Sequence, residues 1–382
     1  MMIFKFLHSI IKTGSIDQSE HVKSTSLEIL KNAKFSPGGL KVIERLQRHG
    51  FQAYFVGGCV RDILLGKIPK DFDIVTNARP RQITDLFSNA IIIGKRFTLV
   101  HIRFQSELIE VATFRKDHGT SQNEVEMIKY DNTYGTLEDD LVRRDFTMNA
   151  LYYDPISRKL IDRYDGLKDL IAKQVKSIGI DENRFTEDPV RMIRAVRYAG
   201  KLDLTLSPAI ERAISEKSLL LAYVPKARLY EEYQKCFNHS KASRVFELMN
   251  RTNLIRHFIP KQLLNKKQTS TISKIIDYVI KHNEIKEHIP CLITFAFIAP
   301  SWAQWSANEE LNQFETIFDA YLSLLSIPRP IEFALKEVFF NIQASTEQAH
   351  RYRLLPKIKA LKSTAHHALK FARISKHIAH KH

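Results

Sequence analysis

The stretch Val56-Gly57-Gly58-Cys59-Val60-Arg61-Asp62, followed after a short gap by Asp71-Phe72-Asp73, decides how the chain is interpreted. A glycine pair lets an anion approach bare backbone N–H groups. If residues 71–75 form a strand, its period of two puts Asp71 and Asp73 on one face and turns Phe72 toward a core. Two oxygen ligands beside a phosphate cradle suit a two-magnesium phosphoryl- or nucleotidyl-transfer site. A lone Asp-x-Asp would indicate only an exposed acidic strand, but the glycine pair upstream favours the metal site.

Composition points to a polyanionic partner. The chain has 382 residues, 44% of them hydrophobic, which is enough for a core and for two or three domains. Lysine and arginine number 58 against 42 acidic residues, a net charge of +16. The segment 351–382 holds nine lysines or arginines, five histidines and no acid. Such an excess predicts binding to nucleic acid.

Cysteine usage and hydropathy bear on the compartment. Cys59, Cys236 and Cys291 are far apart and lack metal-ligand spacing, which favours a reducing cytosol and excludes a disulfide framework. The apolar start, residues 1–11, is too short to span a bilayer. We therefore expect a cytoplasmic protein with no membrane partner.

The order of elements predicts an α+β head built round a small mixed sheet. Residues 115–135 are polar and predict a mobile loop, and from Leu137 onward the pattern is mostly helical. The predicted domains are a leader (1–35), the head (36–165), a helical neck (166–240) and a helical body with a basic tail (241–382). Helices are expected over 36–50, 60–65, 80–87, 209–216, 227–236, 242–249 and 272–282, and strands over 52–56, 70–75, 97–104 and 108–114.

A second polar cluster reads Arg143-Arg144-Asp145-Phe146-Thr147-Met148-Asn149-Ala150. Two guanidinium groups beside a carboxylate suit a triphosphate and a ribose hydroxyl. Taken alone, the same residues would fit a charged helix start with Phe146 and Met148 in the core.

A third cluster begins at Glu187-Asp188-Pro189-Val190-Arg191 and continues through Arg194 and Arg197. Pro189 suits the first turn of a helix, and Asp188 and Arg191 would share one face of it. An acceptor and a guanidinium side by side can hydrogen-bond the edge of a nucleobase. The alternative is a local ion pair that only stabilises the helix.

In this order, the three clusters resemble the class II tRNA nucleotidyltransferase and bacterial poly(A) polymerase family. The motifs are G-G-x-V-R-D with D-x-D, then R-R-D-F-T-x-N, then E-D-P-x-R, and they cover residues 52–198. The resemblance implies a nucleotidyltransferase head followed by an all-α neck and body. It also implies template-free addition of nucleotides to an RNA 3′ end with two magnesium ions, or manganese in their place.

The resemblance further assigns roles to individual residues. Asp71 and Asp73 hold the metals and, with Asp145, are catalytic; Glu110 is a third candidate metal ligand. The phosphates, the ribose and the base of the nucleotide are bound by Gly57, Gly58, Arg61, Arg144, Asp145, Asp188, Arg191, Arg194 and Arg197. Candidate RNA contacts are Lys95, Arg96, Lys226 and Arg228, the last two of which fit a solvated helix face equally well. The segment 165–170 resembles the motif that joins head to neck.

The segment from Ile91 to Ile102 favours the poly(A) polymerase branch of the family over the CCA-adding branch. It resembles the poly(A) polymerase signature, two aliphatic residues followed by G-[basic]-R-F-x-L-x-H, with His101 at its end. The expected reaction is transfer of AMP from ATP to RNA 3′ ends with release of pyrophosphate. The basic tail agrees, because phosphate contacts hold RNA of any sequence.

Two alternatives remain open at this point. A CCA-adding enzyme would share all three motif clusters, and a non-catalytic RNA-binding protein could keep the same scaffold. The expected partners are RNA 3′ ends and ATP. Protein partners from RNA decay are compatible with the family, but the sequence identifies none.

Overall fold

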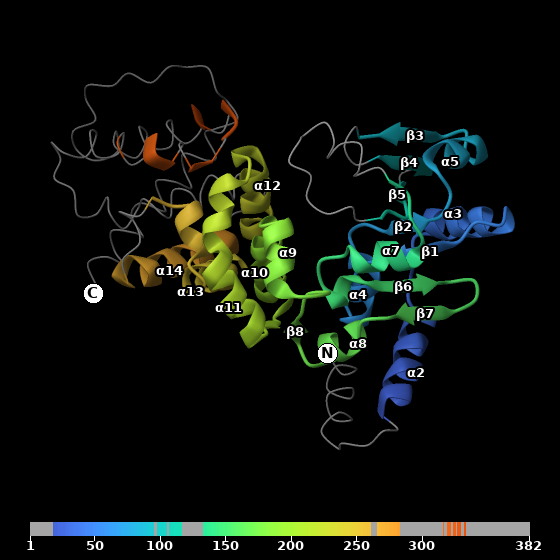
Figure 1. Ribbon diagram of the computed structural model, residues 1–382, viewed down its shortest axis with the longest axis horizontal. Helices are drawn as coiled ribbons and strands as arrows, with labels where there is room; N and C mark the ends of the chain where they lie inside the picture. Colours follow the sequence, from blue (N-terminus) through green and yellow to red (C-terminus); the bar gives the residue numbers. More distant parts are fainter. Residues whose placement is uncertain are drawn as a thin grey trace. The chain divides into compact units, whose positions relative to one another are not determined.

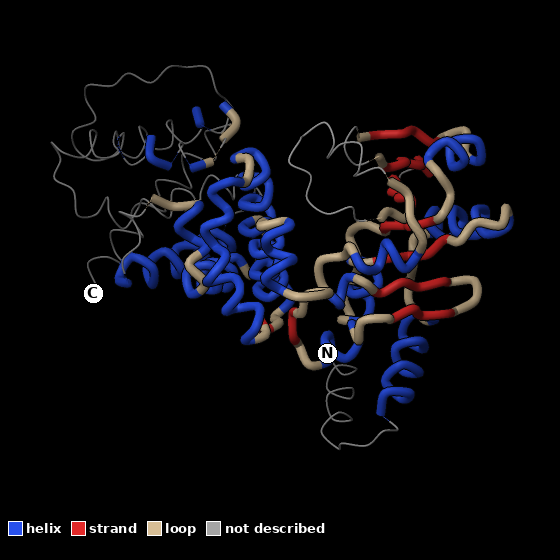
Figure 2. Tube along the Cα trace, in the orientation of Figure 1, coloured by secondary structure: helices blue, strands red, loops and turns tan. Residues whose placement is uncertain are grey.

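The computed structural model describes residues 18–94, 98–104, 107–116, 133–260 and 266–282, with isolated residues between 316 and 333. The chain divides into two compact units (Figures 1 and 2), which are described separately. The first contains Met1–Glu187 and Thr205–Ile210, and the second contains Asp188–Leu204 and Glu211–His382. The domain limits expected from the sequence stay predictions. Part of the expected leader is a helix, α2 (Gln18–Lys31).

The first unit is built on a seven-stranded mixed sheet in the order β3-β4-β5-β2-β1-β6-β7. Only the central pair β2–β5 is parallel; the other pairs in this sheet are antiparallel. The strands are β1 (Ala53–Val56), β2 (Asp73–Thr76), β3 (Ala90–Ile93), β4 (Leu99–Phe104), β5 (Glu107–Thr113), β6 (Leu151–Asp154) and β7 (Lys159–Asp162). The α+β head expected from the sequence is thus confirmed.

Helices cover both faces of this sheet. α3 (Pro37–Arg48) begins as predicted at Ser36, whose Oγ accepts a hydrogen bond of 2.9 Å from the Gly39 N–H. It packs so closely on the sheet that a Cβ at Gly39 would lie 2.7 Å from Phe55. Other elements of the unit are α4 (Gly58–Leu64), α5 (Pro80–Leu86), α7 (Leu137–Val142), η1 (Thr147–Asn149), α8 (Gly166–Ile171), β8 (Gln174–Val175), α9 (Asp181–Glu187) and β9 (Thr205–Leu206).

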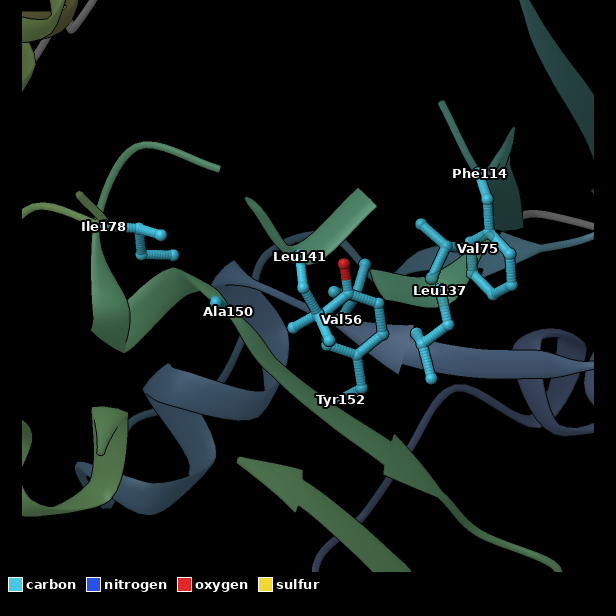
Figure 3. Close-up of a cluster of buried hydrophobic side chains, with 8 residues drawn as sticks. All are labelled: Val56, Val75, Phe114, Leu137, Leu141, Ala150, Tyr152 and Ile178. Atoms are coloured by element: carbon cyan, nitrogen blue, oxygen red, sulfur yellow. The ribbon is translucent and has the colours of Figure 1, made fainter. Parts of the chain in front are cut away.

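On the other face, a hydrophobic cluster joins α7 to the central strands (Figure 3). Alternate residues of β1, β2 and β6 point into it, as the strand period requires. Asp73 precedes Val75 by two residues on β2, so this face carries the core at one end and acidic groups at the other. The cluster consists of Val56, Val75, Phe114, Leu137, Leu141, Ala150, Tyr152 and Ile178.

Two expectations about this unit need correction. Strand β2 begins at Asp73, so Asp71 and Phe72 precede it instead of lying within it. The mostly helical pattern expected from Leu137 onward misses the hairpin β6–β7, which extends the sheet beyond β1. Phe72 does turn inward as predicted, because its ring lies 5.8 Å from the ring of Phe55 and 6.0 Å from that of Phe35.

The second unit consists of helices in the part that the structure describes. α10 (Val190–Leu202) packs against α12 and α13, and Gly200 permits close contact because a Cβ there would lie 2.4 Å from Val245 Cγ2. The other helices are η2 (Ser218–Tyr223), α12 (Lys226–Phe237), α13 (Ala242–Arg251), η3 (Leu254–His257) and α14 (Lys266–His282), while α11 (Pro208–Lys217) spans the division between the units. Within the described residues, no helix combines the length and apolarity needed to cross a bilayer.

Candidate active site

The acidic end of the sheet is formed by neighbouring strands. Asp73 starts β2 and is the direct register partner of Glu110 on the parallel strand β5. Asp71 is exposed and lies just before β2. Burial raises the pKa of Asp73 to about 6, and the charges of Glu110 and Asp71 add to the rise. The structure therefore brings together the two predicted metal ligands and the third candidate, Glu110, which lies in the middle of β5.

This arrangement fits a site for magnesium. A carboxylate whose pKa is raised by burial and by like charges is one that a divalent cation would neutralise. In the described residues, however, no group of three or more His, Cys, Asp or Glu is arranged to hold a metal ion by itself. Magnesium in phosphoryl-transfer sites commonly takes one or two carboxylates and completes its shell with substrate phosphates. Asp73 and its acidic neighbours supply the one or two carboxylates that such a site needs.

The glycine turn connects β1 to α4. Gly57 has a φ of 68°, a left-handed value that favours glycine, and its N–H donates to the Leu151 carbonyl at 3.2 Å. Gly57 is therefore a structural turn residue, and its own N–H is not bare as the sequence pattern suggested. Gly58 is the first residue of α4, and a Cβ on it would lie 3.7 Å from Arg61 Nη2.

Arg61 links this turn to the second cluster. Its side chain is 6% exposed, and both Nε and Nη2 donate to Asp62 Oδ1, at 2.9 and 2.7 Å. Nη1 donates to Asn149 Oδ1 at 2.6 Å, and Asn149 Nδ2 donates in turn to Asp145 Oδ1 at 3.0 Å. The predicted phosphate ligand Arg61 and the predicted catalytic residue Asp145 are thus held by one shared amide.

Arg144 is fixed by a second network. Its Nε donates to the Tyr152 hydroxyl at 2.6 Å, its Nη2 donates to Asp140 Oδ2 at 2.9 Å, and its guanidinium lies 4.8 Å from the centre of the Tyr152 ring. Asp140 also accepts from Arg143 Nε at 2.8 Å. Burial alone would raise the pKa of Asp140, but Arg144, Arg143 and the hydrogen bond from Tyr152 outweigh it and lower the pKa to about 2. The positive charge of Arg144 also acts to lower the pKa of Asp73, so its guanidinium contributes to the electrostatics of the acidic end of the sheet.

The segment predicted to join head and neck is anchored to the Arg-Arg-Asp-Phe-Thr motif. Thr147 Oγ1 donates to Asp169 Oδ2 at 2.8 Å, and Lys176 Nζ lies 2.6 Å from Asp169 Oδ1. Asp165 adopts a left-handed conformation at the start of α8, with a φ of 56°. A Cβ at Gly166 would lie only 2.4 Å from the Thr147 carbonyl oxygen. The two motifs are therefore in direct backbone contact.

In the second unit, the base-reading candidates have partners that the sequence did not suggest. Asp188 Oδ2 forms an ion pair of 2.8 Å with Nη2 of Arg228, which lies on α12. The spacing in the sequence had suggested a local pair with Arg191 instead. Arg194 Nη2 lies 3.5 Å from the Tyr198 hydroxyl. Arg197 is 7% exposed and its Nε is 3.2 Å from Glu232 Oε2, so its guanidinium already has a buried structural partner.

The predicted RNA contacts are only partly visible. Lys95 and Arg96 lie outside the described residues. Lys226 is exposed at the start of α12, whereas Arg228 is engaged with Asp188.

Four residues of the networks were not singled out from the sequence: Asn149, Asp140, Tyr152 and Arg184. Asn149 stands inside the R-R-D-F-T-x-N motif, and Asp140 lies three and four residues before the arginine pair, which is the spacing of neighbours on a helix. Arg184 Nη2 donates to the carbonyls of Val142 and Arg144 at 3.3 and 2.8 Å. Neither Tyr152 nor Arg184 carries a local signal for its role.

Comparison with known proteins agrees with the sequence motifs and the fold. Residues 53–176 match the poly A polymerase head domain, and residues 203–264 match the probable RNA and SrmB-binding site of polymerase A. Poly(A) polymerase I of Haemophilus influenzae is 35% identical over 356 residues, 85% of this chain and 79% of that protein. The chain belongs to the tRNA nucleotidyltransferase and poly(A) polymerase superfamily.

Other relatives fall into both branches of this superfamily. Poly(A) polymerase I of Salmonella typhi is 40% identical over 355 residues, 85% of this chain and 76% of its own length. The CCA-adding enzyme of Lactobacillus gasseri is 37% identical over 215 residues, 56% of this chain and 53% of its own length. The fold is shared with a tRNA nucleotidyltransferase complexed with a primer tRNA and an incoming ATP analogue, with a TM-score of 0.64, 23% identity and coverage of 89% of this chain and 96% of that one.

Proposed function

We propose that this protein is a poly(A) polymerase, a nucleotidyltransferase that adds AMP from ATP to RNA 3′ ends and releases pyrophosphate. The observation that carries the proposal is the length of the match. In sequence, Poly(A) polymerase I relatives align over 85% of this chain, whereas three CCA-adding relatives align over 56 or 57% of it. The signature that ends at His101 supports the same branch.

The reaction assigns a task to each group at the acidic end of the sheet. The RNA 3′ oxygen attacks the α-phosphorus of ATP, the bond to the bridging oxygen of pyrophosphate breaks, and the hydroxyl proton leaves to solvent. Asp73, Asp71 and Glu110 would hold the magnesium ions, or manganese in their place. The ions, when bound, supply positive charge to the triphosphate and to the attacking oxygen.

The chain's own cationic and polar groups would bind and orient the nucleotide. Arg144, whose charge acts on Asp73 and which is fixed by Asp140 and Tyr152, offers a preorganised charge for the triphosphate. Asp145, held by Asn149, would accept a hydrogen bond from the ribose. Arg61 is tied to Asp62 and Asn149, so its contribution to phosphate binding is mainly its charge and the rigidity of the turn.

Recognition of the base would fall to Asp188 and Arg191 at the start of α10. Asp188 is positioned by Arg228, and an oriented carboxylate can accept from the amino group of adenine or cytosine. The ion pair of Arg197 with Glu232 supports a role for Arg197 in holding α10 on α12. We further propose that the protein acts in the cytoplasm, where its buried free thiols Cys59 and Cys236 would stay reduced.

The test is incorporation of labelled nucleotide by the full chain. Purified protein is incubated with magnesium, labelled ATP or CTP, and either a generic RNA or a tRNA that lacks its CCA end. A ladder of many A residues on the generic RNA is expected, and Asp73→Ala should abolish it while the exposed Asp85→Ala should not. Addition that stops after C-C-A, and only on tRNA, would instead identify a CCA-adding enzyme. RNA binding without any transfer, in magnesium or manganese, would indicate a non-catalytic RNA-binding protein.

A further inference from the structure

A histidine stands in line with the acidic groups of the sheet. His101, in the middle of β4, is the register partner of Glu110 on β5, and Glu110 is the register partner of Asp73 on β2. Residues directly opposite one another on neighbouring strands project from the same face. The three side chains therefore form one row across three adjacent strands.

The histidine also has an unpaired polar atom. Nε2 of His101 is buried and has no hydrogen-bond partner among the residues that the structure describes, and it lies 3.3 Å from Glu110 Oε1 without being aligned for a hydrogen bond. Leaving a buried polar group unpaired is unfavourable. The Glu110 side chain is 46% exposed and has room to rotate, so a small rotation would align the two atoms.

We propose that His101 is a positioning residue for Glu110: its Nε2–H holds Oε1 of the carboxylate and leaves Oε2 directed to the side of Asp73. This inference rests on the proposed function, in which Glu110 is a metal ligand. Carboxylates that bind metals are themselves hydrogen-bonded by outer groups, which fix their orientation. This role would explain why the poly(A) polymerase signature ends in a histidine: it places a hydrogen-bond donor, His101, opposite the proposed metal ligand Glu110.

Two substitutions distinguish a role of His101 as a hydrogen-bond donor from a role that depends only on its volume. His101→Leu removes the N–H and keeps most of the volume, whereas His101→Gln restores an N–H donor of similar reach. Loss of an outer partner of this kind typically lowers metal affinity or activity roughly 10- to 100-fold. We expect His101→Leu to lower kcat for AMP transfer within that range, with little change in KM for the RNA, and His101→Gln to recover most of it. Leu108→Ala, at an exposed residue on the same face of β5, is the matched control and should keep normal activity.

A double-mutant cycle then asks whether His101 acts through Glu110. If it does, His101→Leu combined with Glu110→Gln will be no worse than Glu110→Gln alone, because the two residues share one interaction. Additive losses, or a His101→Gln variant as inactive as His101→Leu, would overturn the proposal.

A readout independent of activity is the imidazole nitrogen NMR spectrum of the full chain. The resonance that disappears in His101→Gln identifies His101, and Glu110→Gln should move that resonance. An unchanged His101 resonance would overturn the proposed contact. If the wild-type protein transfers no AMP at all, the proposed function fails, yet this spectrum still decides whether His101 contacts Glu110.

Discussion

Arg61 and Asn149, 88 residues apart in the sequence, are joined by a hydrogen bond of 2.6 Å between Nη1 and Oδ1. The other end of the same amide donates to Asp145 Oδ1 at 3.0 Å. Because an amide has one acceptor end and one donor end, these two contacts fix its orientation. The buried Asn149 thereby sets the position of the glycine turn relative to the Arg-Arg-Asp cluster.

Asn149→Asp should weaken the binding of ATP, because it disturbs the contact that holds Asp145. The new carboxylate can still accept from Arg61, but it loses the donor to Asp145 and places a second negative charge beside it. We expect KM for ATP to rise about tenfold, which corresponds to one lost hydrogen bond of roughly 1.4 kcal/mol. Steady-state AMP transfer measures the effect. An unchanged KM would show that Asp145 keeps its orientation without Asn149.

Asp140→Asn should destabilise the first unit. The aspartate is fully buried and accepts hydrogen bonds from Arg143, Arg144 and Tyr152. Removing one partner of a buried ion pair leaves the other charge uncompensated and costs about 3–5 kcal/mol. Denaturant unfolding measures this loss. Tyr152→Phe is the comparison, because it removes two hydrogen bonds, one from Arg144 and one to Asp140, but no charge, and it should cost less than Asp140→Asn.

The metal-free protein should show a stability that falls as the pH rises through the titration of Asp73. The folded pKa of about 6 lies above the ordinary value of 3.8, so folding favours the protonated form. The contribution of the protonated Asp73 carboxyl to the free energy of unfolding is fully present below pH 4 and is lost as the pH rises through 6. A shift of this size corresponds to about 2–3 kcal/mol.

Asp73→Asn removes that titration. Without divalent ions, the stability of Asp73→Asn relative to wild type should therefore increase between pH 4 and pH 7.5, as measured by urea unfolding. Asp85→Asn, on the exposed side of α5, controls for the loss of one carboxylate. A constant difference between Asp73→Asn and wild type across this range would contradict the expected environment of Asp73.

Sequence alone was sufficient for the features that depend on local periodicity. The alternation over 97–104 and 108–114 predicted the antiparallel pair β4–β5, and the glycine turn between a strand and a helix was found where expected. Both depend on the side-chain period of a strand and on residues close in the chain. The acidic end of the sheet was predicted from Asp71 and Asp73, which are two residues apart in the sequence, although only Asp73 lies within β2.

The hairpin β6–β7 was missed because its strands have only four residues each and lie between helical segments. A local signal existed in the turn that joins them. Asp154 Oδ1 accepts from the Ile156 N–H at 2.9 Å, and Arg158 has a φ of 55°. Such aspartate turns are typical of tight connections between strands.

Partners distant in sequence could not be predicted from one chain. Glu110 meets Asp73 because β2 and β5 are parallel, a register that depends on the whole sheet. The pairing of Asp188 with Arg228, instead of Arg191, likewise depends on how α12 packs beside α10. Side-chain spacing within one helix offered only the local alternative.

The pairing of Arg228 with Asp188 predicts that Arg228 affects the nucleotide more than the RNA. Arg228→Gln would free the Asp188 carboxylate from its partner, so we expect a higher KM for ATP and an altered preference for ATP over CTP. The salt dependence of RNA affinity should stay unchanged. Lys226→Gln, two residues earlier and exposed, is the comparison; if Lys226 contacts a phosphate, its loss reduces the slope of log affinity against log salt by about one. A reduced salt slope in Arg228→Gln would instead support the RNA contact expected from the sequence.

Gly166, at the start of α8, has no space for a side chain because it packs against the backbone of Thr147. A Cβ there would lie 2.4 Å from the Thr147 carbonyl oxygen and 2.9 Å from its carbon, and both are backbone atoms that cannot rotate away. Gly166→Ala must therefore push α8 away from η1 and strain the hydrogen bond between Thr147 and Asp169. We expect a loss of more than about 2 kcal/mol in unfolding free energy together with reduced AMP transfer. Gly50→Asn is the matched control, because that glycine has a φ of 82° and open space around it, so asparagine there should cost less than about 1 kcal/mol. Equal stability of the two variants would show that α8 and η1 can separate freely.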